Sequence, residues 1–324
     1  MPYIYLVAQI GKDIEIAKKF LENNELVGIP TETVYGLAAN ALSEISIAKI
    51  FEVKNRPAFD PLIVHTHSLD SVYDFVTDIH PKLLKLAKAF WPGPLTLLLP
   101  KKNIIPYLLT SNLNRVGVRI PNHSMTLNLL KSLSFPLAAP SANPFGYISP
   151  SNAEHVNKQL GDKIQYILDG GACEVGIEST IIGEENNEII IYRLGGLSTH
   201  EIENIVGKVN IELNESSNPK APGQLKSHYA PRVPLFIGNL KELEKNNSEK
   251  KIGALVFGNY DHSNKQIVVK NLSPKADLRE AAVNLFNYLR AFDEMDIEII
   301  IADYLPPINL GMAINDRLKR AAKK

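Results

Sequence analysis

The sequence predicts an α/β protein of two domains, and three observations lead to that class. The chain has 324 residues, a length typical of about two domains. Short apolar runs of strand character alternate with segments of helical spacing. Most of these apolar runs end in a polar loop marked by proline or glycine. We therefore expect a mixed sheet whose strand ends surround one cavity, followed by a small parallel α/β domain.

The composition excludes several classes of protein. Hydrophobic residues make up 45% and charged residues 22%, as in ordinary globular proteins, and 35 basic residues balance 35 acidic ones. The net field would therefore not steer nucleic acid to the protein. Cys173 is the only cysteine, and because no histidine or cation stands beside it, we expect an inert thiol. No apolar run reaches ~20 residues and the N-terminus lacks a signal-peptide pattern, so we expect a cytoplasmic protein without membrane contact.

The first strand leads into a loop of unusual composition. A helical pattern at residues 13–24 and an apolar run at 26–29 precede Pro30, which has no N–H to continue a strand ladder. Thr31, Glu32, Thr33 and a tyrosine follow, and then Gly36, which tolerates backbone angles that other residues avoid. This pattern is typical of the floor of a polar ligand pocket, and an ordinary strand-to-helix loop is the alternative.

The second polar loop is basic. Residues 43–53 have helical spacing with Ser43 as the cap, and they lead into Lys54, Arg56 and Asp60 between prolines. A buried-type strand at 62–65 follows at once and ends in His65. The loop therefore lies at the entrance of a strand and the histidine at its exit. A solvated charged turn is the alternative to a binding role.

The middle of this half repeats the same arrangement. A helix at 81–90 ends at a Trp91-Pro92-Gly93-Pro94 corner, in which we expect the tryptophan to be a packing anchor, and strands follow at 95–99 and 116–121. The second of these strands contains Arg119, which needs an anion or a carboxylate as a partner. A helix at 126–133 and a short strand at 136–139 come next.

A rigid polar loop and three further strands complete the first half. Residues 140–150 are rich in proline and small polar side chains, and Ser151 is the expected cap of a helix through residue 160. Strands are expected at 166–168, 175–182 and 189–192, and Arg193 closes the last of them. Polar side chains at several strand ends thus point to one shared cavity.

The remaining residues predict a linker and a second domain. Residues 214–220 are polar, whereas 221–231 carry prolines, a histidine and a tyrosine, which a simple tether does not need. Strands at 235–238, 252–258 and 299–302 alternate with helices at 278–292 and 313–322, which predicts a small three-layer parallel domain. We set the boundaries at 1–205, 206–232 and 233–324.

The residues favour chemistry on a nucleotide. The sequence contains no Walker pattern, no Gly-x-Ser-x-Gly nucleophile elbow and no His/Cys cluster at metal-ligand spacing. Cations and neutral hydroxyls at several strand ends are the groups that hold a polyanion. Phosphoryl or nucleotidyl transfer mainly requires alignment and charge neutralisation. The sequence is therefore consistent with a nucleotide-using enzyme that lacks a P-loop.

Seven motifs carry a resemblance to a known family. They are Pro30-Thr31-Glu32-Thr33-Val34-Tyr35-Gly36-Leu37, Lys54-Asn55-Arg56-Pro57, Pro61-Leu62-Ile63-Val64-His65, Trp91-Pro92-Gly93-Pro94-Leu95-Thr96, Val118-Arg119-Ile120-Pro121, Ala139-Pro140-Ser141-Ala142-Asn143 and Glu178-Ser179-Thr180-Ile181. In order and spacing, residues ~10–200 resemble the threonylcarbamoyl-AMP synthase family, the YrdC-like domain. Residues 222–231 and 311–317 resemble the linker and C-terminal domain of the longer, two-domain form.

The resemblance implies a fold and an activity. The fold is a twisted α/β sheet around a basic cavity, followed by a Rossmann-like domain of unclear role. The activity is nucleotidyl transfer, in which L-threonine, bicarbonate or CO2, and ATP form threonylcarbamoyl-AMP and pyrophosphate. A partner tRNA threonylcarbamoyl transferase then modifies the adenosine beside the anticodon, so any contact with tRNA is indirect. Mg2+ is expected on the phosphates of ATP and not in a protein cage.

The resemblance also assigns roles to individual residues. L-threonine is expected at Thr31, Thr33, His65, Arg119, Ala139 and Ser179, with the Arg119 fork on the carboxylate and Ser179 beside the carbamate. ATP is expected at Lys54, Arg56, Asp60, Arg115, Ser141, Asn143, Ser149, Arg193, His228 and Tyr229. No residue is required as a general base, because the carbamate is already an anion. Asp60 stands where relatives often carry Asn, and Gln224-Leu225-Lys226-Ser227 departs from the common linker pattern.

Two other functions remain as alternatives. A carbamoyl-adenylate enzyme of the hydrogenase-maturation type shares such a cavity but needs zinc-finger cysteines, and this chain has one cysteine. A double-stranded RNA-binding module is the second alternative, and the zero net charge and the lack of an RNA motif speak against it. Pyrophosphate release with and without threonine separates these functions.

Overall fold

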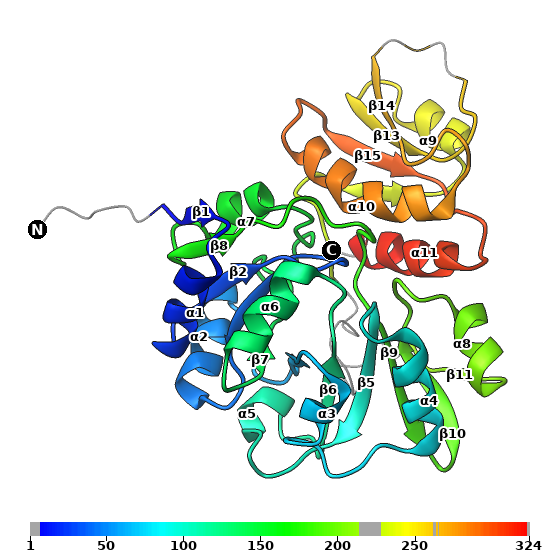
Figure 1. Ribbon diagram of the computed structural model, residues 1–324. Helices are drawn as coiled ribbons and strands as arrows, with labels where there is room; N and C mark the ends of the chain where they lie inside the picture. Colours follow the sequence, from blue (N-terminus) through cyan, green and yellow to red (C-terminus); the bar gives the residue numbers. More distant parts are fainter. Residues whose placement is uncertain (1–6, 214–227, 262–263, 265, 323–324) are drawn as a thin grey trace, which may run out of the picture.

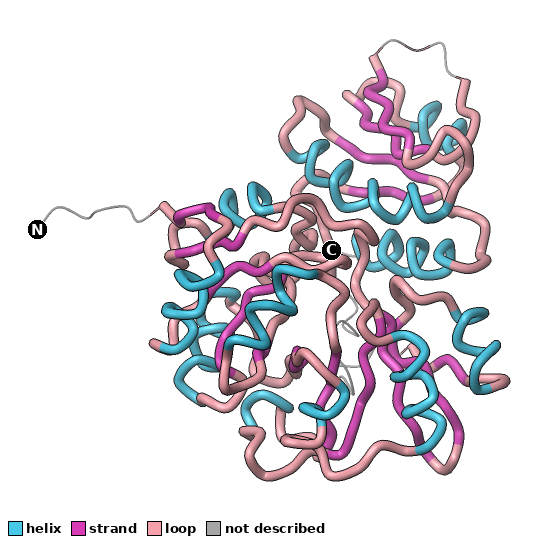
Figure 2. The backbone as a smooth tube through the Cα atoms, viewed as in Figure 1, coloured by secondary structure: helices cyan, strands magenta, loops and turns pink. Residues whose placement is uncertain are grey.

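A large and a small α/β unit make up the structure, which is a computed structural model that describes residues 7–213, 228–261, 264 and 266–322 (Figure 1). Figure 2 shows that helices flank the strands in both units. The resulting class is the predicted one, a large mixed sheet followed by a second, parallel sheet. The predicted boundaries at 205 and 232 stay a prediction, since the last strand of the large sheet is β11 (Asn210–Ile211) and the first of the small sheet is β12 (Leu235–Ile237).

The large unit alternates short strands and helices. Its strands are β1 (Gln9–Gly11), β2 (Val27–Ile29), β3 (Gly36–Asn40), β4 (Ile63–His65), β5 (Leu95–Pro100), β6 (Arg115–Arg119), β7 (Leu137–Ala138), β8 (Tyr166–Leu168), β9 (Thr180–Glu185), β10 (Glu188–Arg193) and β11. Its helices are α1 (Ile14–Glu22), α2 (Glu44–Lys54), α3 (Leu69–Val72), α4 (Pro81–Phe90), α5 (Tyr107–Thr110), α6 (Ser124–Ser132), α7 (Ala153–Leu160) and α8 (Thr199–Val206).

The strands of the large unit form one sheet in the order β1-β8-β2-β3-β7-β4-β6-β5-β9-β10-β11. Parallel pairs such as β4–β6 and β5–β9 alternate with antiparallel pairs such as β2–β3 and β9–β10. Parallel pairing of segments far apart in the chain needs crossovers, which α4 and other helices provide. The predicted mixed sheet is therefore confirmed.

The polar loop after Pro30 leads into a strand. The sequence indicates either the floor of a ligand pocket or a strand-to-helix loop, and neither interpretation includes this strand. Residues 36–40 form β3, which pairs antiparallel with β2 through Gly28 and Leu37, so the loop at 30–35 connects two strands and does not lead into a helix. Gly36 has no positive φ. Its lack of a side chain matters because a Cβ there would lie 3.1 Å from the Cβ of Ala139. Close packing, and not unusual backbone angles, is the reason for this glycine.

The helix starts follow the expected capping chemistry with one correction. Ser43 is the N-cap of α2, and its hydroxyl accepts a hydrogen bond from the Ser46 N–H. The cap of α7 is Asn152 and not Ser151, because the Asn152 side chain accepts from the His155 N–H at 2.8 Å. Trp91 is half-buried against the core, and its Nε1 donates to Leu95 O at 2.7 Å, as expected for a packing anchor.

The small unit is the predicted three-layer parallel domain. Its strands β12, β13 (Ile252–Val256), β14 (Ile267–Asn271) and β15 (Ile299–Ala302) form an all-parallel sheet in the order β12-β15-β13-β14. Helices α9 (Leu240–Asn246), α10 (Leu278–Asp293) and α11 (Leu310–Ala321) cover it. Ala254 and Ile301 pack towards α9, whereas Leu255 and Ile300 belong to the core that includes α10 and α11. Alternating side chains thus bury both faces of the sheet.

The two units pack against each other through α7, α10 and α11. Figure 1 shows α11 between the small sheet and the large unit. Tyr147 donates a hydrogen bond to Asp293 at 2.5 Å, and the guanidinium of Arg290 donates to Ile148 O and to Ser149 O. Arg290 is buried at this boundary. Polar contacts therefore fix the small unit close to the 140–150 loop.

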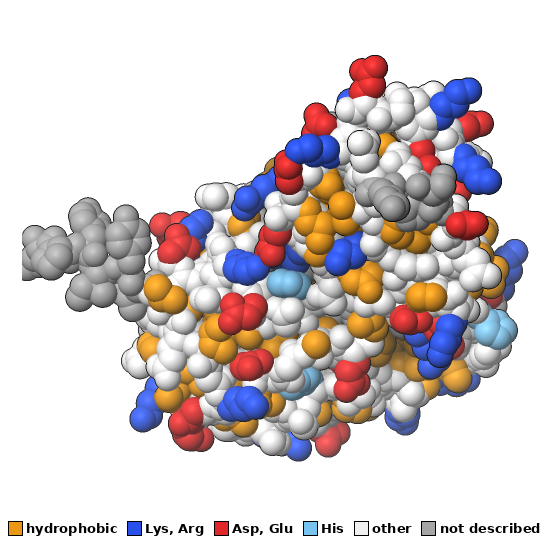
Figure 3. All heavy atoms as spheres, turned by 90° about the horizontal axis from the view of Figure 1, so that it is seen from above, with side chains coloured by type: hydrophobic (Ala, Val, Ile, Leu, Met, Phe, Trp, Pro, Cys, Tyr) orange, Lys and Arg blue, Asp and Glu red, His pale blue; other side chains and the backbone are white. Residues whose placement is uncertain are grey.

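Charged side chains of both signs share the surface seen in one view of the molecule. Figure 3 shows basic and acidic side chains interspersed on the face seen from above. Among the helices that the structure describes, none is both long and apolar enough to span a membrane. The linker residues 214–227, with the Gln224-Leu225-Lys226-Ser227 departure, lie outside the described residues.

Candidate functional site

A cavity with a volume of about 50 Å³ brings together residues from most of the predicted motifs. Its walls come from the loops after β2, α2 and β7, the strand β4, the ends of β6 and β10, the residues just before β9 and the last part of the predicted linker. The lining residues include Thr33, Arg56, His65, Arg119, Ala139, Ser141, Glu178, Ser179, Arg193, His228 and Tyr229. Arginines, neutral hydroxyls and a single lining carboxylate thus surround one space.

Arg119 and His65 lie side by side because β4 and β6 are parallel and pair these two residues. The Arg119 guanidinium is held on three sides: Nη1 donates to the Thr33 hydroxyl at 2.8 Å, Nε to Gly93 O at 3.2 Å, and Nη2 pairs with Glu32 Oε2 at 2.7 Å. The carboxylate partner that an arginine in an apolar strand requires is therefore Glu32. The sequence analysis quoted Glu32 in a motif but gave it no role.

The histidine of this pair is neutral at physiological pH. His65 is buried, and burial followed by the charge of Arg119 lowers its pKa to about 3. A neutral imidazole both donates and accepts hydrogen bonds. His65 is thus suited to binding a hydroxyl or amine of a substrate and adds no positive charge to the cavity.

Arg56 reaches the cavity, held by the loop it belongs to. Its Nη2 pairs with Asp60 Oδ2 at 2.9 Å and donates to Pro61 O at 2.8 Å, while Nε donates to Asp60 O. Asp60 is fully buried in this ion pair. The extra carboxylate at position 60 therefore fixes the arginine and does not line the cavity.

Lys54 lies behind the wall of the cavity. Its Nζ donates to the backbone carbonyls of Ser141 (2.5 Å) and Asn143, and its side chain is buried. Burial and then the charge of Arg56 lower the pKa of Lys54 well below its usual value. The expected contact of Lys54 with a triphosphate does not fit this position, because the amine already holds the 141–143 loop.

The opposite wall of the cavity is formed by the residues just before β9 and by the last residue of β10. Arg193 donates to Ser179 O at 2.9 Å and to its hydroxyl at 3.1 Å, and that hydroxyl also lies 2.7 Å from Thr96 Oγ1. Glu178 Oε1 accepts from Ser149 Oγ at 2.6 Å. Ser149 thus supports the wall from behind, and Glu178 is a second residue whose role the sequence analysis missed.

The segment at 228–229 forms part of the cavity wall. His228 and Tyr229 are buried, their rings are 4.2 Å apart, and the Tyr229 ring stacks on Phe286 of α10 at 5.4 Å. Burial, followed by the charge of Arg56, lowers the pKa of His228 well below its usual value, so the imidazole is neutral. The contact of both residues with ATP stays a prediction.

The other predicted residues fall outside the cavity lining. Thr31 donates to Val34 O at 2.6 Å and lies 2.8 Å from the Thr33 hydroxyl, so it supports the loop. Asn143 donates to Pro144 O and Tyr147 O and stiffens its own loop. Arg115 stands at the far end of β6, where it pairs with Glu185 at 3.0 Å, and its predicted role on the triphosphate does not fit this position.

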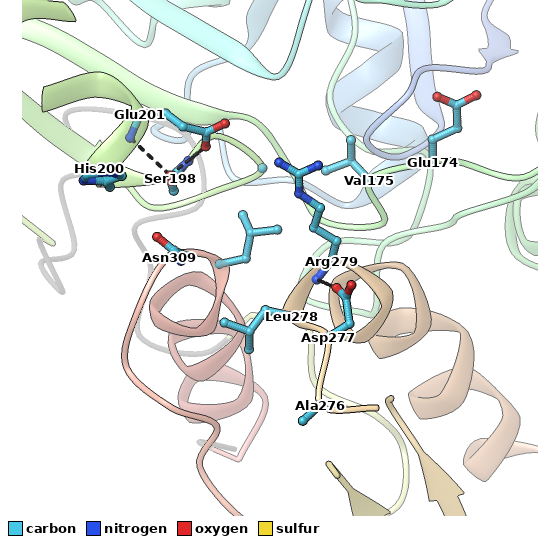
Figure 4. A pocket seen from close by; sticks show the side chains of 12 residues that line it. Glu174, Val175, Ser198, His200, Glu201, Ala276, Asp277, Leu278, Arg279 and Asn309 are labelled. Carbon is cyan, nitrogen blue, oxygen red and sulfur yellow. Dashed lines mark hydrogen bonds between the residues drawn. The ribbon is translucent and has the colours of Figure 1, made fainter. Parts of the chain in front are cut away.

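Two further features of the described part of the chain lie apart from this cavity lining. A larger cavity of about 670 Å³ lies between α8, α10 and α11, with Arg279 directed into it (Figure 4), and none of the predicted site residues lines it. Cys173 is buried, and burial followed by the charge of Glu32 raises its pKa to about 12, as expected for an inert thiol. No group of three or more His, Cys, Asp or Glu side chains suited to a metal occurs in the described residues.

The fold and the cavity define a two-unit α/β protein in which three arginines line one cavity. A family profile described as "Telomere recombination" (Sua5/YciO/YrdC) matches residues 19–195, and one described as "Threonylcarbamoyl-AMP synthase, C-terminal domain" matches residues 197–323. The chain belongs to the threonylcarbamoyl-AMP synthase family. This result favours the predicted enzyme over the two alternative functions.

Individual relatives match over nearly the whole chain. Threonylcarbamoyl-AMP synthase of Pyrococcus abyssi is 38% identical over 95% of this chain and 94% of its own length, and that of Bacillus subtilis is 37% identical over 94% and 92%. The crystal structure of P. abyssi Sua5 complexed with L-threonine superposes with a TM-score of 0.89 at 36% identity, covering 98% of this chain and 97% of the other. A P. abyssi Sua5 variant with a His-Tyr pair replaced by alanine gives a TM-score of 0.88 at 36% identity, covering 97% and 96%.

Proposed function

We propose that this protein joins L-threonine, bicarbonate or CO2, and ATP into threonylcarbamoyl-AMP, with release of pyrophosphate. The observation that carries the proposal is the convergence of Arg56, Arg119 and Arg193, from three separate segments, on one cavity. Neutral hydroxyls complete the lining, so the site offers positive charge together with hydrogen-bond donors. Family membership supplies the reaction.

The end of the cavity with Arg119 is assigned to threonine. Arg119, Thr33 and His65 lie together there, and the guanidinium fork fits the two oxygens of the amino-acid carboxylate. Neutral His65 and the Thr33 hydroxyl then bind the body of the substrate, with Ala139 beside them in the wall. Ser179 lies next to the place where the carbamate forms.

The nucleotide is assigned to the other side. Arg56 and Arg193 neutralise the phosphates, Ser141 donates to them, and His228 with Tyr229 covers the nucleotide. Lys54, Asp60, Asn143 and Ser149 act one layer behind, through the contacts that fix these groups. This arrangement revises the sequence-based expectation that all of them touch ATP.

The chemistry follows from this arrangement. The free threonine amine adds to CO2 and releases a proton to solvent, which gives a carbamate anion. A carbamate oxygen then attacks the α-phosphorus of ATP in line, and the bond to pyrophosphate breaks as pyrophosphate leaves. The arginines stabilise the charge that develops on the phosphates. Glu178, the lining carboxylate, is already paired, so the described residues offer no cage for Mg2+, which enters with ATP as part of the substrate.

The product fixes the expected partners. Threonylcarbamoyl-AMP is a mixed anhydride, so the next enzyme is a transferase that moves the threonylcarbamoyl group to tRNA. Direct tRNA binding is not required for the reaction proposed here. Because ATP and tRNA are its substrate and final target, we place the protein in the cytoplasm.

The test is pyrophosphate release with and without L-threonine, in the presence of bicarbonate and Mg·ATP. We expect release only when threonine is present. Because charge-assisted contacts are worth about 1.5–3 kcal/mol each, Arg56→Ala should lower turnover by about tenfold or more. Lys251→Ala, at an exposed ion pair in the small unit, is the matched control and should keep the parent rate. Release without threonine, or parent turnover in Arg56→Ala, would contradict the proposal.

A further inference from the structure

One buried arginine of the C-terminal unit reaches into the wall of the cavity. Arg317 lies on α11 and its side chain is fully buried. Its Nε and Nη2 each lie 3.1 Å from Oε2 of Glu178, and its Nη1 donates to Leu194 O. The guanidinium also faces the Tyr229 ring at 5.5 Å from the ring centre.

Arg317 also lies 3.3 Å from the carboxylate of Asp316 on its own helix, and the other three contacts belong to the walls of the cavity. Glu178 and Tyr229 line it, and Leu194 directly follows Arg193, which also lines it. Glu178 is fixed from its other oxygen by the Ser149 hydroxyl at 2.6 Å. A single side chain of the second unit therefore connects the β9 start, the β10 end and the segment that covers the cavity.

The charge of Arg317 has a consequence for anion binding. Glu178 lines the same cavity as three arginines, and an unpaired carboxylate there would repel a triphosphate. The planar guanidinium holds this carboxylate and neutralises it, in a geometry that an ammonium group cannot reproduce. Removal of Arg317 would leave a buried carboxylate without its partner.

Docking of the two units does not depend on this residue alone. Ser151 contacts Asn287 at 2.5 Å, Tyr147 contacts Asp293, and Lys158 pairs with Glu294 on the surface. None of these three contacts involves Glu178 or Arg317. A role of Arg317 in the site can therefore be separated from a role in docking.

We propose that Arg317 is a positioning residue of the active site, through which the C-terminal unit fixes Glu178 and Tyr229 in the nucleotide half of the cavity. The second unit is then part of the catalytic machinery. This inference rests on the proposed function, because it assigns the neighbourhood of Glu178 and Tyr229 to ATP.

The test compares Arg317→Lys and Arg317→Met with Glu294→Gln, which breaks an exposed ion pair between the units. Because at least one of the two charge-assisted hydrogen bonds from the guanidinium to Glu178 Oε2 is lost, we expect both Arg317 variants to raise the KM for ATP about tenfold or more, with little change in the KM for threonine. Glu294→Gln should keep both values. Folded Arg317 variants with the parent KM for ATP would overturn the proposal.

A second comparison separates positioning from stability. Arg317→Met/Glu178→Gln removes the uncompensated carboxylate, so we expect its thermal midpoint to return towards that of the parent while the KM for ATP stays raised. If both the thermal midpoint and the KM for ATP returned to the parent values, Arg317 would only compensate a buried charge. This double variant also decides the matter if Arg317→Met alone does not fold.

Hydrogen exchange gives a readout that does not depend on catalysis. The Ala230 N–H donates to Gly146 O at 2.9 Å, directly after Tyr229. We expect this amide to exchange faster in Arg317→Lys than in the parent and in Glu294→Gln, and unchanged exchange would count against the positioning role. Failure of the parent to release pyrophosphate with threonine would instead overturn the proposed function and leave this result standing.

Discussion

The arginines of the cavity are held in place by protein partners before any substrate binds. Arg119 is fixed by Glu32 and Thr33, Arg56 by Asp60, and Arg193 by Ser179. Binding then requires little loss of side-chain entropy, because the charged groups already point in one direction. Orientation, and not only charge, is thus supplied both by Glu32 and Asp60 behind the wall and by Thr33 and Ser179 in the wall itself.

The first prediction concerns Arg119→Lys, which keeps the charge but loses the fork. We expect the KM for threonine to rise by about tenfold or more, since one charge-assisted contact is lost, while the KM for ATP barely changes. Steady-state pyrophosphate release at varied threonine and varied ATP measures both values. Equal losses for the two substrates would remove Arg119 from the threonine site.

Single residues also show what the sequence could not provide. The motifs correctly brought Thr33, His65, Arg119, Ser179 and the linker pair to one cavity. They could not show that the Lys54 amine donates hydrogen bonds to two backbone carbonyls, 87 and 89 residues further along the chain. Nor could they show that Arg115 pairs with Glu185, 70 residues away. A charged residue in a motif predicts that a polar or oppositely charged partner lies close to it. Only the folded structure shows whether that partner is another residue or leaves room for a substrate.

Among the elements, local patterns predicted the helices better than the strand pairing. The bounds of α4, β8 and β15 follow directly from hydrophobic spacing and breakers. Strand β3 was missed, because its residues, Gly-Leu-Ala-Ala-Asn, include no β-branched or aromatic side chain of strand character. Its pairing with β2 and β7 provides the ladder that composition alone does not predict.

The second prediction concerns the contact between the ends of β9 and β10. A Cβ at Gly195 would lie 2.3 Å from Glu178 O and 2.5 Å from Thr180 N, and these are backbone atoms that cannot turn away. We expect Gly195→Ala to lower the free energy of unfolding by about 1–3 kcal/mol and to reduce turnover, because Ser179 and Arg193 are pushed apart. Chemical denaturation and pyrophosphate release measure the two effects.

The control for this prediction is Gly238→Ala. A Cβ at Gly238 would meet its nearest neighbour, Leu243 Cδ1, at 3.7 Å, which is an ordinary van der Waals contact. This variant should keep the parent stability and rate. If Gly195→Ala behaved like Gly238→Ala, the close approach of these two segments would not be needed for the site.

On the scale of the whole molecule, the second unit supports one wall of the cavity from behind. Tyr229, which lines the cavity, lies between His228, Phe286 of α10 and Arg317 of α11. The cavity volume of about 50 Å³ is small against the ~300–1,000 Å³ of ordinary ligand sites. Under the proposed function, closure of the segment at 228–229 over the nucleotide keeps water from it.

The last prediction tests this closure in the full-length protein with His228→Ala plus Tyr229→Ala. The product is a mixed anhydride that water hydrolyses, so a site left open should lose product as well as speed. We expect turnover to fall and the ratio of threonylcarbamoyl-AMP recovered to pyrophosphate released to fall with it. Tyr147→Phe, which removes one hydrogen bond between the units outside the cavity, is the matched control and should keep that ratio. If the double variant stays folded with the parent rate and ratio, the segment is only a connector between two units, since a covering role requires that its removal exposes the anhydride.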